Sequence, residues 1–301
     1  MIRHYPMNAV SIAHVSDLHL PFEPRLSPSQ RLSKRQLSAW SWRRRRALHR
    51  HEILDALVAD LRAHPVDHIV VTGDVTNFSL PGEFRQAEAW LQRLAPADRI
   101  SVVPGNHDAL VAVADADGLG RWAPWTRAGG GWPSVHRLGG VTIVGLNSAL
   151  PTAPLLARGR LGGDQLARLE QVLRAEGEAG RQRIVLVHHP VADGVVSWRK
   201  ALGDRAELRG VLQRAGAELV LHGHARDSSL NALPGAHGAI PCLCVPSSSA
   251  VPNPRDEGAR WNRYVLARDH VDVRVRRWSV EDDAFVDDRQ FTLPVPVRAH
   301  G

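Results

Sequence analysis

Cysteine is scarce in this sequence, with only two among 301 residues. Cys242 and Cys244 alternate with Leu243 and Val245 in the run PCLCVP. This alternation predicts that both thiols are buried in a strand, and it argues against a disulfide or a metal-binding pair of cysteines. We expect the reducing cytoplasm as the compartment, because disulfides are rare there.

Long apolar runs are absent as well. No stretch reaches the roughly eighteen consecutive apolar residues that a membrane helix needs. The first residues, MIRHYPMNAVSIAHV, contain no uninterrupted apolar core, which argues against a signal peptide. Low-complexity tracts, repeats and long linkers are also missing, so we expect a single domain over residues 1–301. Its 44% of hydrophobic residues suffice for a large core.

Lysine is nearly absent, since Lys34 and Lys200 are the only two. The net charge of +7 therefore comes almost entirely from arginine. Such a bias is weak functional evidence, because genome composition alone is enough to produce it. A basic surface nevertheless suits anionic substrates, which include phosphates, nucleic acids and acidic lipids.

Short β-branched runs alternate with longer helical patterns, which predicts a layered α/β fold. Strands are expected at 11–17, 67–74, 99–104, 141–148, 183–188 and about 218–222, and helices at about 48–62, 83–94, 163–176 and 204–214. From about residue 239 the pattern becomes strand after strand, beginning with IPCLCVP. We expect these strands to form an antiparallel continuation, a β-rich C-terminal part of the same domain.

Polar residues stand at the ends of the predicted strands. The carboxyl ends of strands in α/β sheets meet at one edge and form the ligand site. Each motif alone is weak evidence, but together they supply the imidazole, carboxylate and amide donors that a pair of divalent ions needs. In chain order they are Asp17 and His19 in DLH, Asp74 in GD, Asn106 to Asp108 in GNHD, His188 in HHP and His224 in GHAR.

These motifs resemble the pattern of the calcineurin-like metallophosphoesterase superfamily, which is DxH, GD, GNH followed by Asp or Glu, a later His, and GHxH. The resemblance spans Ile12 to about Arg226 and includes the branch of cyclic-nucleotide phosphodiesterase-like enzymes. It implies a four-layer sandwich of two mixed β-sheets flanked by helices. The metal site is then expected at the C-terminal ends of the strands.

The same resemblance implies two divalent metal ions, of Mn, Fe, Zn or a similar kind, with Asp74 as the bridging ligand. A hydroxide that bridges the ions would attack phosphorus in line. His107 is implied as the catalytic residue that stabilises the transition state or protonates the leaving oxygen. The implied ligands are Asp17, His19 and Asp74 for the first ion, and Asp74, Asn106, His188 and His224 for the second.

Arg226 is a departure from the pattern, because it stands where the superfamily usually has the last histidine ligand of the first ion. A guanidinium has no lone pair to donate, so we expect the first ion to bind more weakly. Three alternatives stay open: Arg226 binds a substrate phosphate, it turns to solvent or to Asp227, or it leaves the site impaired. His222 and His237 are candidates for a substitute ligand.

Asn77 is a second departure, because phosphatases and many cyclic-nucleotide phosphodiesterases have Asp at this position. An amide orients the catalytic histidine but does not neutralise its charge. We therefore expect His107 to be a weaker acid–base partner, unless Asp108 takes over. Asn77 and Arg226 are the predicted substrate-binding residues.

Residues 21–50 form an unusual basic segment, in which Trp40 and Trp42 precede the run Arg43 to Arg46. Because this basic arm directly follows the DLH motif, we expect it to be helical, to cap the metal site and to influence specificity. Tryptophan beside arginine suits an anionic lipid surface and, less well, nucleic acid. Alternatively the tryptophans pack on the core and the arginines solvate one helix face.

The sequence thus predicts a cytoplasmic metal-dependent hydrolase of phosphoester bonds, with peripheral membrane contact left open. The substrate is expected to be a small phosphorylated molecule or a lipid-linked phosphate. The alternative is a phosphate-binding or nucleic-acid-binding module with an impaired metal site. The oligomeric state is not indicated.

Overall fold

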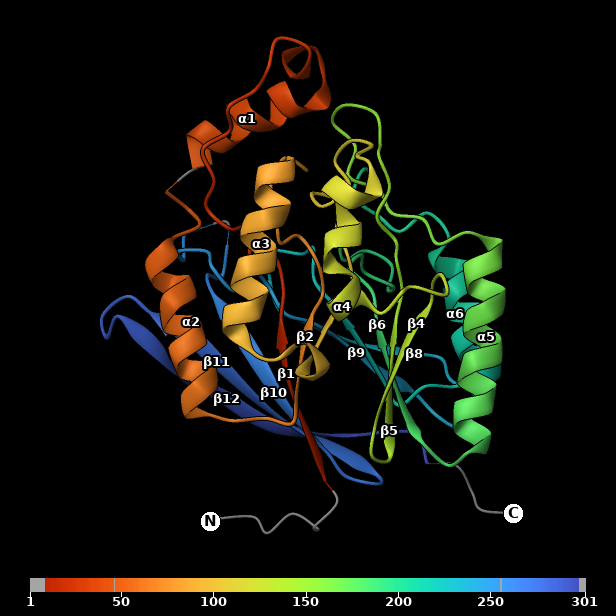
Figure 1. Cartoon of the computed structure of the whole chain (residues 1–301). Helices are drawn as coiled ribbons and strands as arrows, with labels where there is room; N and C mark the ends of the chain where they lie inside the picture. The colour runs from red at the N-terminus through yellow and green to blue at the C-terminus, as the bar shows by residue number, and fades with distance from the viewer. Residues whose placement is uncertain (1–8, 46, 255, 298–301) are drawn as a thin grey trace.

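Two mixed β-sheets form the centre of the protein (Figure 1). The computed structural model describes residues 9–45, 47–254 and 256–297. The first sheet has the strand order β12-β11-β10-β1-β2-β3. Its parallel half is β1 (Val10–Val15), β2 (His68–Val71) and β3 (Ile100–Val102), and its antiparallel half is β10 (Arg260–Leu266), β11 (His270–Ser279) and β12 (Ala284–Pro294).

The second sheet has the order β4-β5-β6-β7-β9-β8. Its four central strands are parallel, and the two edge strands are antiparallel to their neighbours. The bounds are β4 (Ser134–Leu138), β5 (Val141–Gly145), β6 (Gln182–Leu186), β7 (Leu219–His222), β8 (Ser229–Leu233) and β9 (Ile240–Cys244).

The position of β9 corrects the sequence-based expectation for the C-terminal part. IPCLCVP was expected to begin an antiparallel continuation, but β9 pairs in parallel with β7 in the second sheet. Only β10, β11 and β12 are antiparallel additions, and they extend the first sheet. Cys242 and Cys244 are buried in β9 and are not joined in a disulfide, as predicted.

The sheets pack face to face through apolar side chains of both, among them Ile12 and Val70 from the first sheet and Ile143 and Leu221 from the second. Helices cover the two outer faces (Figure 1): α2 (His51–Ala63) and α3 (Pro81–Leu94) on one side, α5 (Gly163–Glu178) and α6 (Arg205–Ala215) on the other. The predicted four-layer sandwich of two mixed sheets is therefore confirmed.

The outer helices form because their apolar residues recur with helical spacing. In α2 the buried residues are Ile53, Leu54, Leu57, Val58 and Leu61, which lie on one face and pack on the first sheet. Each such side chain contributes about 1.5–3 kcal/mol when it is fully buried. None of the helices in the described ranges combines the length and the apolar character of a membrane span.

The basic arm contains α1 (Lys34–Arg45), which stands above the end of α3 in Figure 1. Lys34 donates from Nζ to Thr152 Oγ1 and to the carbonyl of Leu156, each at 2.7 Å. Arg35 donates to the carbonyls of Phe78 and Ser79 at 3.0 and 2.6 Å. Two cations thus fasten α1 to separate loops of the body. Arg46 lies outside the described residues, and so do the side chains of Arg44 and Arg45.

Glu176, near the end of α5, makes a buried electrostatic contact that depends on pH. The hydrogen bond from Arg137 lowers the pKa of Glu176 from 4.5 to about 2 against the opposing effect of burial, with Arg181 and Thr142 assisting. A carboxyl group whose pKa is lower in the folded state than in the unfolded state stabilises the protein at pH values above its unfolded-state pKa. This contribution is lost as the pH falls through the folded-state pKa.

We expect Glu176→Gln to lower the free energy of unfolding by about 1–2 kcal/mol at neutral pH, because the variant loses the charge that pairs with Arg137. The loss is limited to this size because solvent screens the exposed end of Arg137. The difference from wild type should shrink as the pH falls from 4.5 to about 2. Urea unfolding across this range is the measurement, with the exposed Glu207→Gln of α6 as control. A difference that stays constant with pH would contradict the assignment.

Candidate metal centre

The loops at the carboxyl ends of the strands are joined to one another by backbone hydrogen bonds. The N–H of Asp17 donates to Gly73 O and that of His19 to Asp74 O, each at 2.9 Å. The N–H of Gly223 donates to His188 O at 3.1 Å, which joins two loops of the second sheet. These bonds hold the predicted ligands of each sheet close to one another.

Four of the predicted ligands have a left-handed backbone conformation, which is uncommon for residues other than glycine. The φ angles are 49° for Asp17, 42° for His19, 52° for Asp74 and 67° for His224. Such conformations cost of order 1–3 kcal/mol each and cluster at functional sites. The strain therefore coincides with the residues that the sequence motifs single out.

Two motif glycines allow backbone to pass directly against the carboxylates. A Cβ atom at Gly105 would lie 2.2 Å from Oδ1 of Asp74. A Cβ atom at Gly223 would lie 1.8 Å from Oγ of Ser16 and 2.5 Å from Oδ2 of Asp17. Any side chain at these positions would displace a carboxylate, so the motifs GNHD and GHAR require glycine here.

The other three predicted ligands of the second ion surround the Nε2 atom of His188. Nε2 lies 3.4 Å from Oδ2 of Asp74, 3.2 Å from Oδ1 of Asn106 and 3.1 Å from Nδ1 of His224. Nδ1 of His188 donates to the carbonyl of Thr72 at 2.7 Å. A ligating histidine usually donates its other N–H in this way, which leaves the Nε2 lone pair for a metal.

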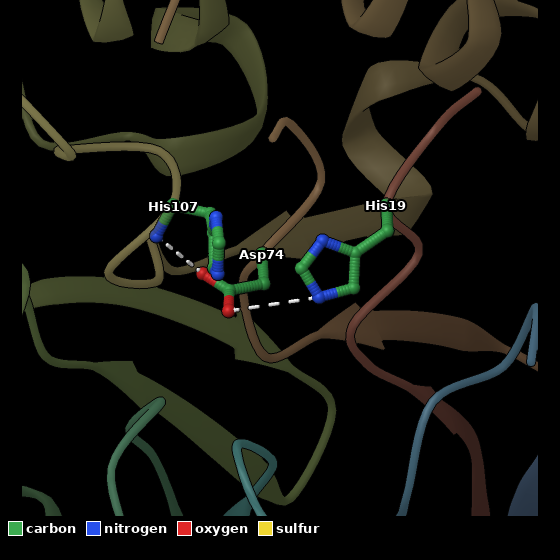
Figure 2. Close-up of side chains that lie close together, drawn as sticks. All are labelled: His19, Asp74 and His107. Carbon is green, nitrogen blue, oxygen red and sulfur yellow. Dashed lines mark hydrogen bonds and ion pairs between the residues drawn. The ribbon is translucent and has the colours of Figure 1, made fainter. Parts of the chain in front are cut away.

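The first set of predicted ligands also gathers around Asp74. Nε2 of His19 is 3.9 Å from Oδ2 of Asp74, and Figure 2 shows Asp74 between His19 and His107. Asp17 lines the same cavity and accepts hydrogen bonds on Oδ2 from Ser16 Oγ at 2.6 Å and His224 N at 2.9 Å. Asp74 is common to two groups of neighbouring donor atoms, one with His19 and His107 and the other with His188 and His224.

Buried charges in the cluster favour the presence of cations. Burial raises the pKa of Asp17 to about 6, although the charge of His188 opposes this. Burial and the nearby Asp74 raise the pKa of Asp108 to about 7. Burial lowers the pKa of the His188 imidazole, but interaction with the negatively charged Asp74 outweighs the effect of burial and raises that pKa to about 9. Divalent ions would compensate these crowded carboxylates, and the mixed oxygen and nitrogen donors suit Mn, Fe or Zn, so the residues fit a metal centre.

His107 is oriented through its backbone neighbours. Its N–H donates to Oδ1 of Asp74 at 2.7 Å (Figure 2), and its Nδ1 donates to the backbone carbonyl of Asn77 at 2.9 Å. The side-chain amide of Asn77 instead donates to Leu20 O at 2.9 Å. Asp108 accepts hydrogen bonds from the N–H groups of Gly105 and Thr76, so it positions the loops.

Arg226 is exposed and lines the same cavity as Asp17 and Asp74. The guanidinium of Arg226 is close to Asp256. Burial raises the pKa of the Asp256 carboxyl, and the positive charge of Arg226 opposes that rise. His222 is buried in β7 with Nδ1 near the carbonyl of Gly223, whereas His237 is exposed in the turn between β8 and β9. Neither histidine is among the residues that line this cavity.

Two residues of the site were not identified from the sequence. The ring of His49 lies 4.6 Å from the ring of His19, between their centroids, and both line the cavity around Asp17. Lys200 lines this cavity together with His107 and His224. Neither follows a strand, so no strand-end motif marks them. The scarcity of lysine was the only signal for Lys200.

A second cavity of about 330 Å³ adjoins the metal centre beneath α1. It shares His19 and His107 with the metal centre, and Arg199 and Lys200 also line it. Its apolar lining comes from the basic arm and from three loops: Leu37, Trp42, Phe78, Leu110, Leu155 and Leu156. Trp42 packs edge-on against Phe78, with ring centroids 6.0 Å apart, while Trp40 on the same helix is 54% exposed.

Comparisons with known proteins identify the family and support the fold. A sequence model of the calcineurin-like phosphoesterase family matches residues 10–225. Among solved structures, a dimetal phosphatase from Danio rerio is similar over 95% of this chain and 98% of its own, with 14% identity and a TM-score of 0.62. The purple acid phosphatase PPD1 from seeds of yellow lupin, Lupinus luteus, is similar over 95% of this chain and 54% of its own, with 12% identity and a TM-score of 0.56. No curated protein matches the sequence.

Proposed function

The chain belongs to the calcineurin-like phosphoesterase family, and from this premise we propose that it hydrolyses phosphoester bonds with two divalent ions of Mn, Fe, Zn or a similar kind. The observation that supports the proposal most directly is the position of Asp74, whose carboxylate lies close to donor atoms of His19 and His107 and also to those of His188 and His224. When bound, two such ions supply a water molecule activated near neutral pH and neutralise the phosphoryl oxygens.

The protein's own groups then orient the reaction. Thr72 fixes the ring of His188 through Nδ1, and Asp108 fixes the loop that presents Asn106 and His107. His107 exchanges a proton through Nε2, because Nδ1 is committed to the carbonyl of Asn77. We assign His107 the delivery of a proton to the leaving oxygen. The experiment that tests the proposed activity is the Asp74 substitution, which is argued in the Discussion.

Cations near the centre are proposed to bind the phosphate. Lys200 lines both cavities, Arg199 lines the apolar cavity, and Arg226 lines the metal cavity. Charge-assisted hydrogen bonds from such groups to phosphate oxygens are stronger than neutral ones. The predicted contact of Asn77 with substrate stays a prediction, as do a cytoplasmic location and contact with an anionic membrane.

We further propose that the substrate joins the phosphate to an apolar group such as an acyl chain. The apolar cavity shares His19 and His107 with the metal centre, so a phosphate at the centre would place its substituent beneath α1. Its volume of about 330 Å³ fits one such substituent. Apolar side chains are also exposed at its rim, where Leu37 is 47% and Leu155 is 79% exposed.

A long alkyl chain on a p-nitrophenyl phosphodiester should therefore raise kcat/KM relative to a methyl group. Leu37→Glu should reduce that gain in kcat/KM about tenfold, because one apolar contact with the alkyl chain is lost. The matched control is Leu230→Glu, because Leu230 is a 51% exposed leucine of β8 and does not line the cavity. Equal kcat/KM for the long and short chains would exclude an apolar substituent.

A further inference from the structure

His49 is fixed by its backbone beside the metal centre. The N–H of Val251 donates to Leu48 O at 2.7 Å, and that of Arg50 donates to Ser249 O at 3.2 Å. An isolated β-bridge pairs His49 with Ala250. The junction between the basic arm and α2 is thus attached to the segment that follows β9, and His49 has a defined place there.

The side chain of His49 is directed by the same segment. Its Nδ1 lies 2.8 Å from Oγ of Ser249, while Oγ of Ser247 donates to the carbonyl of Asp17 at 2.7 Å. Two serines of one segment therefore position both the imidazole and the first predicted ligand. The half-buried ring of His49 packs against that of His19 with an interplanar angle of 49°.

The donor set of the first ion is short by one ligand. Asp17, His19 and Asp74 remain, because the guanidinium of Arg226 cannot coordinate a metal. His49 lines the same cavity of about 380 Å³ as these three residues and Arg226. If Nδ1–H of His49 donates to Ser249, the lone pair is on Nε2, which is the usual arrangement of a ligating histidine.

We propose that His49 supplies the fourth protein ligand of the first ion, in place of the histidine that Arg226 replaces. The inference rests on the proposed function insofar as it takes two ions to be bound. It makes the basic arm part of the metal centre, since His49 lies at the end of the arm. Ser249 is then a positioning residue that orients the ring.

The test is the metal content of His49→Ala. We expect wild type to keep two Mn²⁺ per chain after dialysis and the variant to keep one, with the second bound at least about tenfold more weakly in a titration. Cobalt substitution gives an independent readout, because loss of a nitrogen ligand changes the visible absorption of bound Co²⁺. The matched control is His51→Ala, an exposed histidine two positions along the chain, which should keep two ions.

Two further variants keep the inference falsifiable if His49→Ala folds poorly. Arg226→His in the His49→Ala background should restore the second ion, because it returns a ligand from the other side of the cavity. Ser249→Ala should lower the affinity for the first ion about 10-fold to 100-fold, although the imidazole of His49 is still present. Unchanged affinity for both ions in His49→Ala overturns the proposal, whereas two bound ions without hydrolysis in wild type would refute only the proposed function.

Discussion

Replacing Asp74 with Asn is expected to lower kcat/KM for bis-p-nitrophenyl phosphate by about 10³-fold or more, since the two ions contribute several kcal/mol of charge stabilisation. The carboxylate of Asp74 lies within reach of both His19 and His188, and it also accepts the N–H of His107. Asparagine keeps the shape of the side chain but carries no charge and has only one oxygen. The variant should therefore lose the ligand that both ions share.

The measurement is hydrolysis with added Mn²⁺, together with the metal content after dialysis. Asp55→Asn is the control, because Asp55 is an exposed aspartate of α2 that pairs with Arg93. Retention of both ions and full activity by Asp74→Asn would refute the bridging role. If wild type itself shows no metal-dependent hydrolysis of mono- or diesters, the phosphate-binding module with an impaired site becomes the better interpretation.

Replacing His107 with Gln should lower kcat by about 10²–10⁴-fold for a diester with a poor leaving group, which is the usual contribution of a general acid. An alkoxide needs a proton as the bond to phosphorus breaks, and Nε2 of His107 is the proposed donor. p-Nitrophenolate is stable without that proton at neutral pH. The loss should consequently be much smaller for bis-p-nitrophenyl phosphate.

The comparison of the two leaving groups separates proton transfer from positioning. His237→Gln, which changes an exposed histidine in the turn after β8, is the control and should leave both rates unaltered. The pH profile for the poor leaving group should also lose its alkaline limb in His107→Gln, because that limb reports loss of the acid's proton. An equal loss of rate for both leaving groups would show that His107 does not deliver the proton to the leaving oxygen.

The strand-end motifs allowed much of the centre to be predicted from sequence. Asp17, Asp74 and His188 each follow a buried parallel strand, and parallel strands align their carboxyl ends at one edge. Hydrophobic periodicity likewise sufficed for the outer helices, because their burial pattern is local in the chain. It did not distinguish the parallel β9 from the antiparallel strands after it, since strand direction depends on the partner and not on the run itself.

The orientation of His107 was not predictable in the same way. Asn77 was expected to act through its side-chain amide, yet its backbone carbonyl contacts Nδ1. Every residue has such a carbonyl, so the identity of the side chain contains no information about this bond. The amide is used elsewhere, on Leu20, which lies 57 positions away in the chain.

By itself the sequence determined the family and the donor residues of the candidate metal centre, because these donors and the motif glycines follow strands whose carboxyl ends meet. Only the tertiary structure decided what else lies at that edge. His49 and Ser249 are 200 positions apart in the chain, yet their side chains are 2.8 Å apart beside His19. Such a contact arises when the end of the basic arm packs on the segment after β9, and no local pattern in either segment encodes the other.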